Sequence, residues 1–406
     1  MMPINVRNTA RVTDITLLLT ARGLRGFGDG FASIILPAYL SAIGFTTAEI
    51  GFAATASLLG TALLTLAVGI VARRYELRSL LMIGAGIIVL TGVTFPNLTS
   101  VIVIFAVAFA GSLNPNSGDM GPLVPLEHAA LAKEAAADNR TSVFARYSLV
   151  GALAIAAGSL AAGVPQLLAH HGITELAALK AMFYFYALLG LIAALLYRRL
   201  QFGNVYAESK RKEPLGPSRG IVYKLAALFS LDAFAGGFAV QSLLALWLFE
   251  RFDLSLVAAS LFFFCSNLPS AFSFPVAARI AKRFGLINTM VYTHIPSSIC
   301  LILAAFLPTM PLAMGLLLVR SALSQMDVPT RSSYVMAVVT PAERPAAASF
   351  TAVPRSLASS FSPAFAGLML AGPFSGLPLV VCGVLKIAYD LGLLYSFRHV
   401  KPPEEG

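Results

Sequence analysis

The sequence predicts an all-α integral membrane protein with twelve transmembrane helices in two pseudo-symmetric bundles of six. Three observations lead to this fold class. First, 57% of the 406 residues are hydrophobic and only 12% are charged, whereas soluble domains carry roughly 25% charged residues. Second, twelve apolar runs each reach the roughly 20 residues that a membrane-spanning helix needs. Third, motifs of the first half return in the second half in the same order.

The expected spans follow one another with short connections, except at one place. A basic and polar segment, 201–220, separates the sixth span from the seventh and is expected to be a cytoplasmic linker. We therefore divide the chain into an N-terminal six-helix bundle, 1–200, and a C-terminal six-helix bundle, 221–406. The expected spans are 13–43, 46–72, 77–96, 99–122, 141–168, 176–198, 221–249, 255–281, 286–306, 310–336, 345–371 and 374–397.

The lysine and arginine residues determine the expected orientation. They gather on alternate connections, which the positive-inside rule assigns to the cytoplasm, and the even number of spans then puts both termini there. Membrane topology thus explains the net charge of +10, and no nucleic-acid binding is expected. We expect a monomeric, multi-pass protein of the cytoplasmic (inner) membrane, with the lipid bilayer around it.

The sequence contains no clear motif for a metal, a cofactor or covalent catalysis. The three cysteines, Cys265, Cys300 and Cys382, lie in apolar runs and lack metal-ligand spacing. Neither a phosphate-binding glycine loop nor a nucleophile-elbow pattern occurs. We expect no cofactor, no metal site and no enzymatic activity.

Charged residues inside the apolar runs mark the candidate functional region. Arg22, Arg25 and Asp29 share one side of the first span, where a charge must face the protein interior or a water-filled cavity. The stretch 24–32 recurs in the seventh span with the same packing residues, but with Asp232 in the place of Arg25. These two positions are therefore equivalent in the two halves.

The tenth span carries a second polar stripe. Arg320, Ser324, Asp327 and Arg331 follow one another at helical spacing and should project from one side of the helix. Pro329 removes a backbone hydrogen bond near the cytoplasmic end of this span, which predicts a bend there.

The turn after the second span resembles the signature motif of the major facilitator superfamily. Gly69, Arg74 and Arg78 match that motif, and Arg283 matches it in the corresponding turn after the eighth span. Both turns carry a basic residue where the motif has an aspartate. The stretch 320–331 also resembles a branch of bacterial facilitators that includes drug and metabolite exporters.

This resemblance implies alternating access, with the first, fourth, seventh and tenth helices lining a central cavity. Together with the intramembrane charges it indicates two groups of candidate residues. The expected substrate or proton cavity residues are Arg22, Arg25, Asp29, Asp232, Gln241, Arg320, Ser324 and Arg355. The expected cytoplasmic gate residues are Gly69, Arg74, Arg78, Asp119, Arg283, Asp327 and Pro329.

Ions at membrane depth are expected to be paired, because an isolated ion in low dielectric is costly. Arg25 has two candidate partners, namely Asp232 across the cavity and Asp29 one turn along its own helix, and the sequence leaves this choice open. Lys386 and Asp390 are one turn apart and are expected to neutralise each other.

Two further features have expected structural roles. The glycine-rich fifth span should serve helix packing, and His294 should bond a backbone carbonyl.

From these features we expect a secondary active transporter that moves a small organic solute, with proton-coupled export as the preferred mode. Asp29 or Asp232 would exchange the proton. The alternative within transport is uptake or exchange of an anionic carboxylate or phosphate, clamped by arginines such as Arg22 and Arg320. The alternative of another class is a non-transporting membrane sensor or assembly partner.

Overall fold

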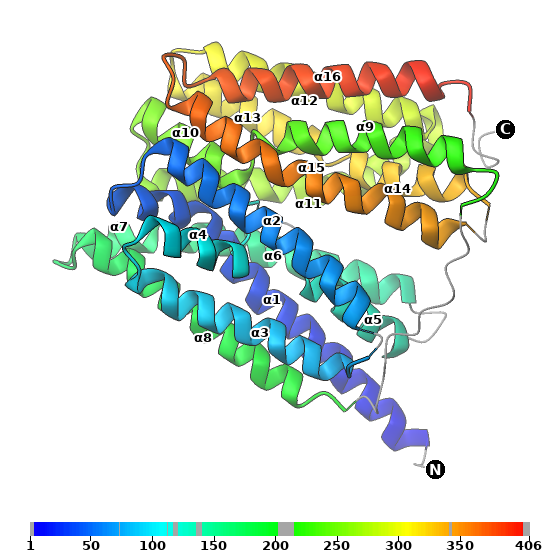
Figure 1. Ribbon diagram of the computed structural model, residues 1–406, viewed down its shortest axis with the longest axis horizontal. Coiled ribbons are helices and arrows are strands. Elements are labelled where there is room, and N and C mark those ends of the chain that lie inside the picture. The colour runs from blue at the N-terminus through cyan, green and yellow to red at the C-terminus, as the bar shows by residue number, and fades with distance from the viewer. Residues whose placement is uncertain are drawn as a thin grey trace. The chain divides into compact units, whose positions relative to one another are not determined.

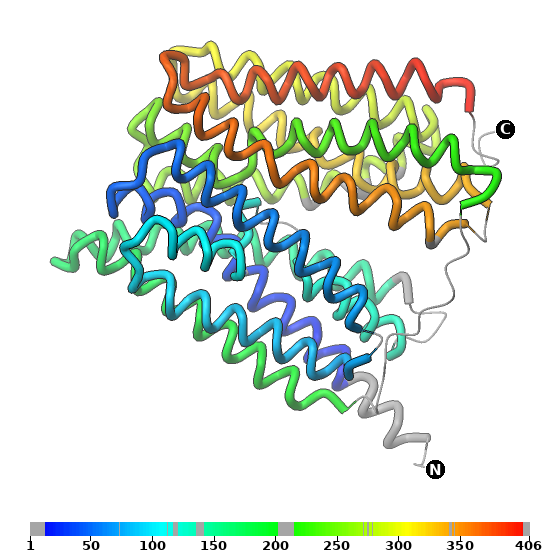
Figure 2. Tube along the Cα trace, viewed as in Figure 1, coloured from blue at the N-terminus to red at the C-terminus, as the bar shows by residue number. Residues whose placement is uncertain are grey.

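The computed structural model describes residues 4–72, 74–111, 113–116, 121–134, 140–201, 215–340 and 343–400. Within these ranges all regular secondary structure is helical. Figure 2 follows the chain through the helices from the N-terminus (blue) to the C-terminus (red). The expected all-α fold is therefore confirmed for the described part of the chain.

The helices of the N-terminal half fall on the expected spans, and two of those spans are interrupted. The fourth span begins with the ten-residue α4, and the described residues between it and α5, namely 111, 113–116 and 121–122, are not helical. The fifth span continues after Ala162 and Gly163 into the short α7. The helices are α1 (Ile4–Ala42), α2 (Thr47–Val71), α3 (Leu77–Thr94) with the 3₁₀ turn η1 (Phe95–Asn97), α4 (Val101–Ala110), α5 (Leu123–Glu134), α6 (Arg140–Ala161), α7 (Val164–Ala169) and α8 (Glu175–Arg198).

The C-terminal half shows two further interruptions, in the seventh and tenth spans. The seventh breaks just after Gly236 and Gly237, a residue type that weakens a helix interior. The tenth breaks at Gln325 and Met326, because Pro329 has no amide hydrogen to donate to the carbonyl four residues earlier. The helices are α9 (Arg219–Gly237), α10 (Gln241–Phe252), α11 (Leu256–Phe284), α12 (Leu286–Phe306), α13 (Met310–Ser324), α14 (Asp327–Ala337), α15 (Arg344–Leu370) and α16 (Leu377–Phe397).

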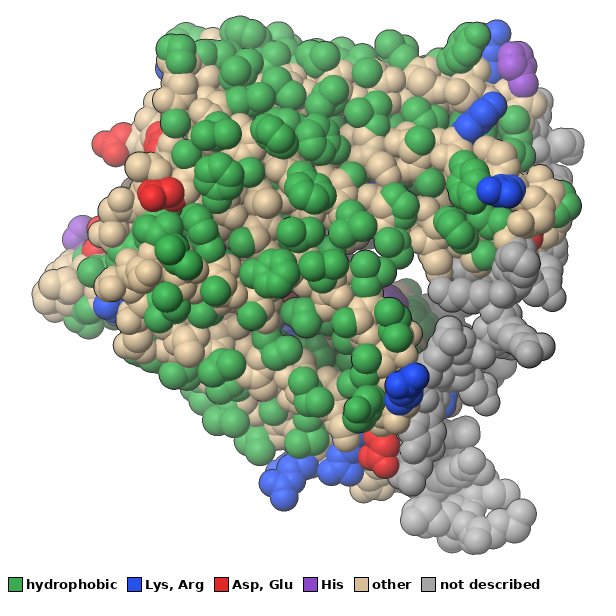
Figure 3. Space-filling model, in the orientation of Figure 1, with side chains coloured by type: hydrophobic (Ala, Val, Ile, Leu, Met, Phe, Trp, Pro, Cys, Tyr) green, Lys and Arg blue, Asp and Glu red, His purple; other side chains and the backbone are tan. Residues whose placement is uncertain are grey.

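Seven of the described helical segments are long and apolar enough to cross a membrane by length and composition alone. Of the remaining expected spans, the first carries buried charges in α1, and the fourth and tenth are divided into shorter helices. Figure 3 shows hydrophobic side chains over the sides of the helices and charged side chains at the helix ends. This distribution is the one that a lipid environment requires.

The chain forms two compact units of helices (Figure 1). Unit 1 contains Met1–Phe45, Ala56–Ser209 and Ser255–Phe264, and unit 2 contains Thr46–Thr55, Lys210–Leu254 and Cys265–Gly406. Each half of the chain thus contributes a short segment to the other unit. The boundaries at 200 and 221 remain a prediction of the sequence.

Glycines allow the closest helix pairs to form in each unit. A methyl group at Gly158 of α6 would overlap the backbone carbonyl of Phe27 in α1. In unit 2 a methyl group at Gly237 of α9 would overlap Ser362 of α15. These two helix pairs have the most extensive contacts in the structure. The packing role expected for the glycine-rich fifth span is therefore confirmed at Gly158.

The only tryptophan has a different environment from the one the sequence suggests. Its place at the outer end of the seventh span is typical of an interfacial anchor. In the structure Trp247 is only 1% exposed and stacks edge-on against Phe252, with the ring centroids 5.4 Å apart. Trp247 is therefore a core residue of α10.

Glu343 holds the end of the linker against unit 2, outside the membrane-spanning segments. Its carboxylate accepts hydrogen bonds from the Gly216 backbone amide, the Ser218 amide (3.3 Å) and the Ser218 hydroxyl (2.7 Å). The Thr340 hydroxyl donates a further bond of 2.6 Å. Because these donors stabilise the ionised form, they lower the pKa of Glu343 from 4.5 to about 2.

This anchor should make the stability of the protein depend on pH in the acid range. A carboxyl group with a lowered pKa stabilises the fold fully above its unfolded pKa of 4.5 and loses this contribution as the pH falls toward about 2. We expect Glu343→Gln to lower the melting temperature of the purified protein at pH 7. The difference from the wild type should shrink steadily below pH 4.5.

Glu175→Gln is the matched control, since Glu175 also begins a helix but is exposed. It should change the melting temperature little across the same pH series. A Glu343→Gln difference that stays constant down to pH 3 would contradict the assignment.

Candidate functional site

A buried ion pair holds the charged part of α1 in unit 1. The Arg25 guanidinium binds the carboxylate of Glu127 on α5, and the two side chains are 7% and 0% exposed. The hydroxyls of Tyr147 on α6 and Tyr197 on α8 donate to the same carboxylate. Glu127 therefore connects four helices through one cation and two phenols, and its charge is compensated where water is excluded.

Arg22 lies one turn before Arg25 and is equally buried, at 1% exposure. Its guanidinium carbon lies 5.3 Å from the ring centroid of Tyr147, within the range of a cation–π interaction. A methyl group at Gly151 of α6 would overlap this guanidinium. The glycine thus leaves the space that the arginine fills.

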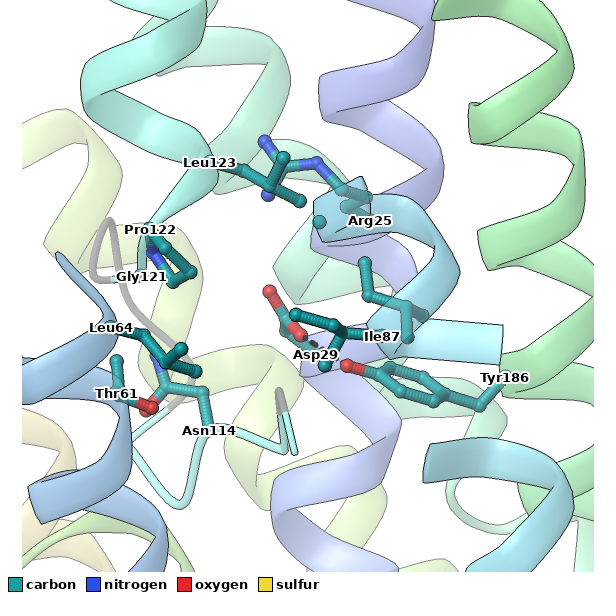
Figure 4. A pocket seen from close by; sticks show the side chains of 12 residues that line it. Arg25, Asp29, Thr61, Leu64, Ile87, Asn114, Gly121, Pro122, Leu123 and Tyr186 are labelled. Carbon is teal, nitrogen blue, oxygen red and sulfur yellow. Dashed lines mark hydrogen bonds between the residues drawn. The ribbon is translucent and has the colours of Figure 1, made fainter. Parts of the chain in front are cut away.

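Asp29 faces a small cavity of mixed polar and apolar lining in unit 1 (Figure 4). The Tyr186 hydroxyl donates to the Asp29 carboxylate at 3.3 Å. Arg25 lines the same cavity, and Thr61 and Asn114 lie on its other wall. The volume is about 30 Å³, which is room for one or two water molecules. A proton or a water molecule could reach this carboxylate, but a solute could not fit in the cavity as it stands.

A larger charge network surrounds Asp232 in unit 2. Lys386 of α16 donates to one carboxylate oxygen at 2.6 Å, and Arg331 of α14 donates to the other at 3.1 Å. Arg331 also binds Asp327, one turn earlier in α14, at 2.8 Å. Its guanidinium carbon lies 5.6 Å from the ring centroid of Phe229. Two cations from two helices therefore hold a carboxylate that is 4% exposed.

His294 of α12 extends this network to a third carboxylate. Its Nε2 lies 3.2 Å from Lys386 Nζ, and its Nδ1 lies 3.0 Å from Asp390. An ammonium group only donates hydrogen bonds, so Nε2 must accept from Lys386 and Nδ1 must carry the proton that bonds Asp390. A continuous hydrogen-bonded chain thus links Asp390, His294, Lys386 and Asp232.

The other expected cavity residues of the C-terminal half also lie in unit 2, but they are not part of the hydrogen-bonded network around Asp232 described above. Arg355 on α15 is within electrostatic range of Asp232 and Arg331, and its Nε is buried without a hydrogen-bond partner among the described residues. Arg320 on α13 is part-buried. Gln241 begins α10, and Ser324 ends α13, so both mark helix interruptions.

The expected gate residues lie in different environments. Arg74 and Arg283 are exposed, and Arg78 is part-buried. A methyl group at Gly69 would meet no other atom, so close packing does not require a glycine at this position. Asp327 is 4% exposed in the network with Arg331.

Pro329 and Asp119 are the two remaining expected gate residues. Pro329 lies in the first turn of α14, next to the helix break that its missing amide explains. Asp119, another expected gate residue, lies outside the described residues.

The structure corrects three expectations about pairing. Within unit 1 the Arg25 guanidinium bonds Glu127 and not Asp29 among the described residues, and the pairing of Arg25 with Asp232 of unit 2 stays a prediction. Lys386 and Asp390 do not neutralise each other, because Lys386 bonds Asp232 and Asp390 bonds His294. His294 bonds a carboxylate, where a backbone carbonyl was expected.

Sequence reasoning missed the acidic and phenolic residues that complete these networks. Glu127 follows the fourth expected span and is not among the expected site residues, yet it lies on the buried face of α5. An apolar stripe around it, formed by residues such as Leu123 and Leu131, was a usable signal of burial. The roles of Tyr147 and Tyr197 have no such signal in the sequence.

Comparison with known proteins identifies the family. The family model described as Major Facilitator Superfamily matches residues 18–363. The chain belongs to the Major Facilitator Superfamily. It is a multi-pass integral membrane protein with the fold of that family, and it is a secondary transporter of small solutes rather than an enzyme.

Individual relatives are distant. The chain is 24% identical to the uncharacterized membrane protein YJR124C of Saccharomyces cerevisiae, covering 95% of this chain and 94% of that protein. The D-xylose–proton symporter has a similar structure, with a TM-score of 0.76, 17% identity and coverage of 97% and 99% of the two chains. The nucleoside transporter NupG has a TM-score of 0.74 at 16% identity, covering 95% of this chain and 100% of that one. These structures share the fold and indicate no particular branch of the family.

The ion pair between Arg25 and Glu127 should be essential for the stability of unit 1. We expect Glu127→Gln to destabilise the protein by about 3–5 kcal/mol, since it leaves the buried Arg25 without its anion. The measurement is unfolding of the purified protein in detergent. The double variant Arg25→Gln/Glu127→Gln should be less destabilised than the sum of the two single variants.

Glu250→Gln, at an exposed position of α10, is the control and should change stability by no more than about 0.5 kcal/mol. Equal effects of Glu127→Gln and Glu250→Gln, or strict additivity of the pair, would refute the role of this interaction.

Proposed function

We propose that this transporter is a proton-coupled exporter of a small organic solute in the cytoplasmic membrane, working as a monomer by alternating access. Asp29 in unit 1 and Asp232 in unit 2 are the proposed proton-exchanging carboxylates. The lysine and arginine distribution supports an orientation with both termini in the cytoplasm. The family supports alternating access between two substrate-accessible states.

The observation that carries the proposal is the bonding of Asp232 by Lys386 and Arg331. In the ionised form this carboxylate balances two buried cations that would be costly alone. A proton on Asp232 cancels its charge, and Lys386 then keeps only the neutral His294 as a close partner. The protonated and ionised forms of the network therefore favour different arrangements of α9, α14 and α16.

Proton coupling requires such a difference between the protonated and the ionised form of the network. A proton can drive a conformational change only if it binds one state more tightly than the other. Moving Lys386 away from Asp232 would favour protonation of the carboxylate, and protonation would in turn favour that movement. Asp29 offers a second such position, because Arg25 is engaged by Glu127 and the carboxylate faces a water-sized cavity.

The proposal predicts that transport needs both the proton gradient and an ionisable residue 232. We expect Asp232→Asn to abolish gradient-driven efflux from proteoliposomes containing purified protein. A protonophore should abolish efflux by the wild type. Asp253→Asn is the matched control, since Asp253 lies in an exposed left-handed turn (φ 49°) that asparagine also adopts, and it should transport normally.

Two outcomes would disprove proton coupling at this site. One is wild-type efflux that is unchanged by the protonophore. The other is gradient-driven efflux by Asp232→Asn at the rate of the Asp253→Asn control.

A second candidate is transport of an anionic solute, and Arg355 supports it. Its buried Nε has no hydrogen-bond partner among the described residues, and unpaired buried donors of this kind are costly. Arg320 adds a second part-buried guanidinium in unit 2. Together they provide the forked donors that bind carboxylate or phosphate groups.

Ligand competition separates the two candidates. If the solute is an anion, organic acids or phosphate esters should raise the melting temperature of the wild type, and lipophilic cations should not. Arg355→Lys, which keeps the charge but loses the planar fork, should reduce that shift. Stabilisation by lipophilic cations alone would exclude the anionic solute.

A further inference from the structure

A second and larger cavity lies in unit 2, away from the Asp232 network. Its volume is about 330 Å³, which corresponds to roughly ten water molecules in the liquid. Two segments far apart in the sequence form it, namely the turn between α11 and α12 and the end of α16. We call it the basic cavity. The lining residues that matter here are Lys282, Arg283, Gly285, Ile287, Phe397 and Arg398.

The charge of the basic cavity has one sign. Lys282, Arg283 and Arg398 line it, and no carboxylate occurs among its described lining residues. Arg283 lies 5.4 Å from the ring centroid of Phe284, and the Nε of Arg398 donates to His399 at 2.8 Å. These contacts orient both guanidinium groups before any ligand arrives.

The backbone at this place adds to the positive potential. α12 begins at Leu286, and its first turn lines the basic cavity through Ile287 and Asn288. The amino end of a 21-residue helix carries a partial positive charge and favours anions. Gly285 precedes it with a φ of 85°, a conformation that other residues rarely adopt. This glycine makes the sharp turn that brings the helix start beside the cations.

The floor and the rim of the basic cavity differ from its charged walls. Ile287 and Phe397 are 7% and 2% exposed and form an apolar floor. Phe284, which also lines the cavity, is 54% exposed, and Tyr395, one turn before Arg398, is 86% exposed. Exposed aromatic side chains next to clustered cations are typical of the level of lipid headgroups. Membrane topology alone explains why cations occur on this connection. It does not explain why cations from two distant segments line the same cavity above apolar side chains.

We propose that the basic cavity binds a phosphate group, carried either by an anionic phospholipid or by a soluble phosphate compound. Two arginines can each bind phosphate oxygens through a planar fork, and a lysine adds a point charge. The volume exceeds that of a single phosphate, so a phosphate with an attached glycerol or similar group fits as well. The site lies outside the proposed proton network, and its occupancy is independent of the coupling mechanism.

The test compares two ligand sources on the purified full-length protein in detergent. One arm titrates inorganic phosphate, and the other titrates a short-chain phosphatidylglycerol against short-chain phosphatidylcholine. Chloride keeps the ionic strength constant, since exposed charges are screened by salt. The readout is the shift in melting temperature, which follows ligand occupancy.

The cavity variant is Lys282→Gln/Arg398→Gln. Its matched control is Arg199→Gln/Lys224→Gln, which removes the same charge at exposed positions outside the cavity. We expect the wild type and the control to be stabilised in at least one arm, and the cavity variant to bind about tenfold more weakly or worse. Stabilisation by phosphatidylglycerol alone identifies a lipid ligand, and stabilisation by phosphate identifies a soluble one.

Three results would overturn the proposal. They are no stabilisation of the wild type in either arm, an undiminished response of the cavity variant, and an equal loss of response in the control. Because these variants leave Asp232 and Asp29 intact, failure here would leave the transport proposal standing. Conversely, a transport-inactive Asp232→Asn variant should still respond to the phosphate ligand.

Discussion

The compensation of buried charge is the physical constraint on which the rest of this structure depends. A lone ion at membrane depth costs several kcal/mol even after relaxation. Each unit therefore supplies partners for its own ions. Glu127 and two tyrosines surround Arg25 in unit 1, and Lys386 and Arg331 surround Asp232 in unit 2. These contacts decide which faces of the helices meet inside each unit.

The same constraint links packing with function. Gly151 leaves space for Arg22, and the hydroxyls of Tyr147 and Tyr197 donate hydrogen bonds to the carboxylate that also binds Arg25. A network balanced in this way is sensitive to a single proton, because adding one leaves a cation without its counterion. Proton coupling needs this sensitivity, and the network around Asp232 has it.

The sequence predicted the helices well, but it predicted poorly which charged side chains pair with one another. The spans follow from apolar length, which is a local property, and the division into halves at 200 and 221 stays a prediction from internal repetition. The breaks in the seventh and tenth spans have local causes in Gly236, Gly237 and Pro329. The ion pairs join residues about one hundred positions apart, such as Arg25 with Glu127 and Asp232 with Arg331. Equivalent positions in a repeat suggested Arg25 with Asp232, but repetition gave no indication of Glu127, which binds Arg25 within unit 1.

The sequence by itself determined that this protein is helical and spans the membrane, with charges on its first, seventh and tenth spans, because bilayer thickness and the cost of buried ions act on composition directly. Only the tertiary structure decided that Glu127 binds Arg25, that His294 joins Lys386 to Asp390, and that cations from two distant segments meet in one cavity. Such pairings depend on helix rotation and depth, which packing sets to within a few ångströms and which no local pattern encodes.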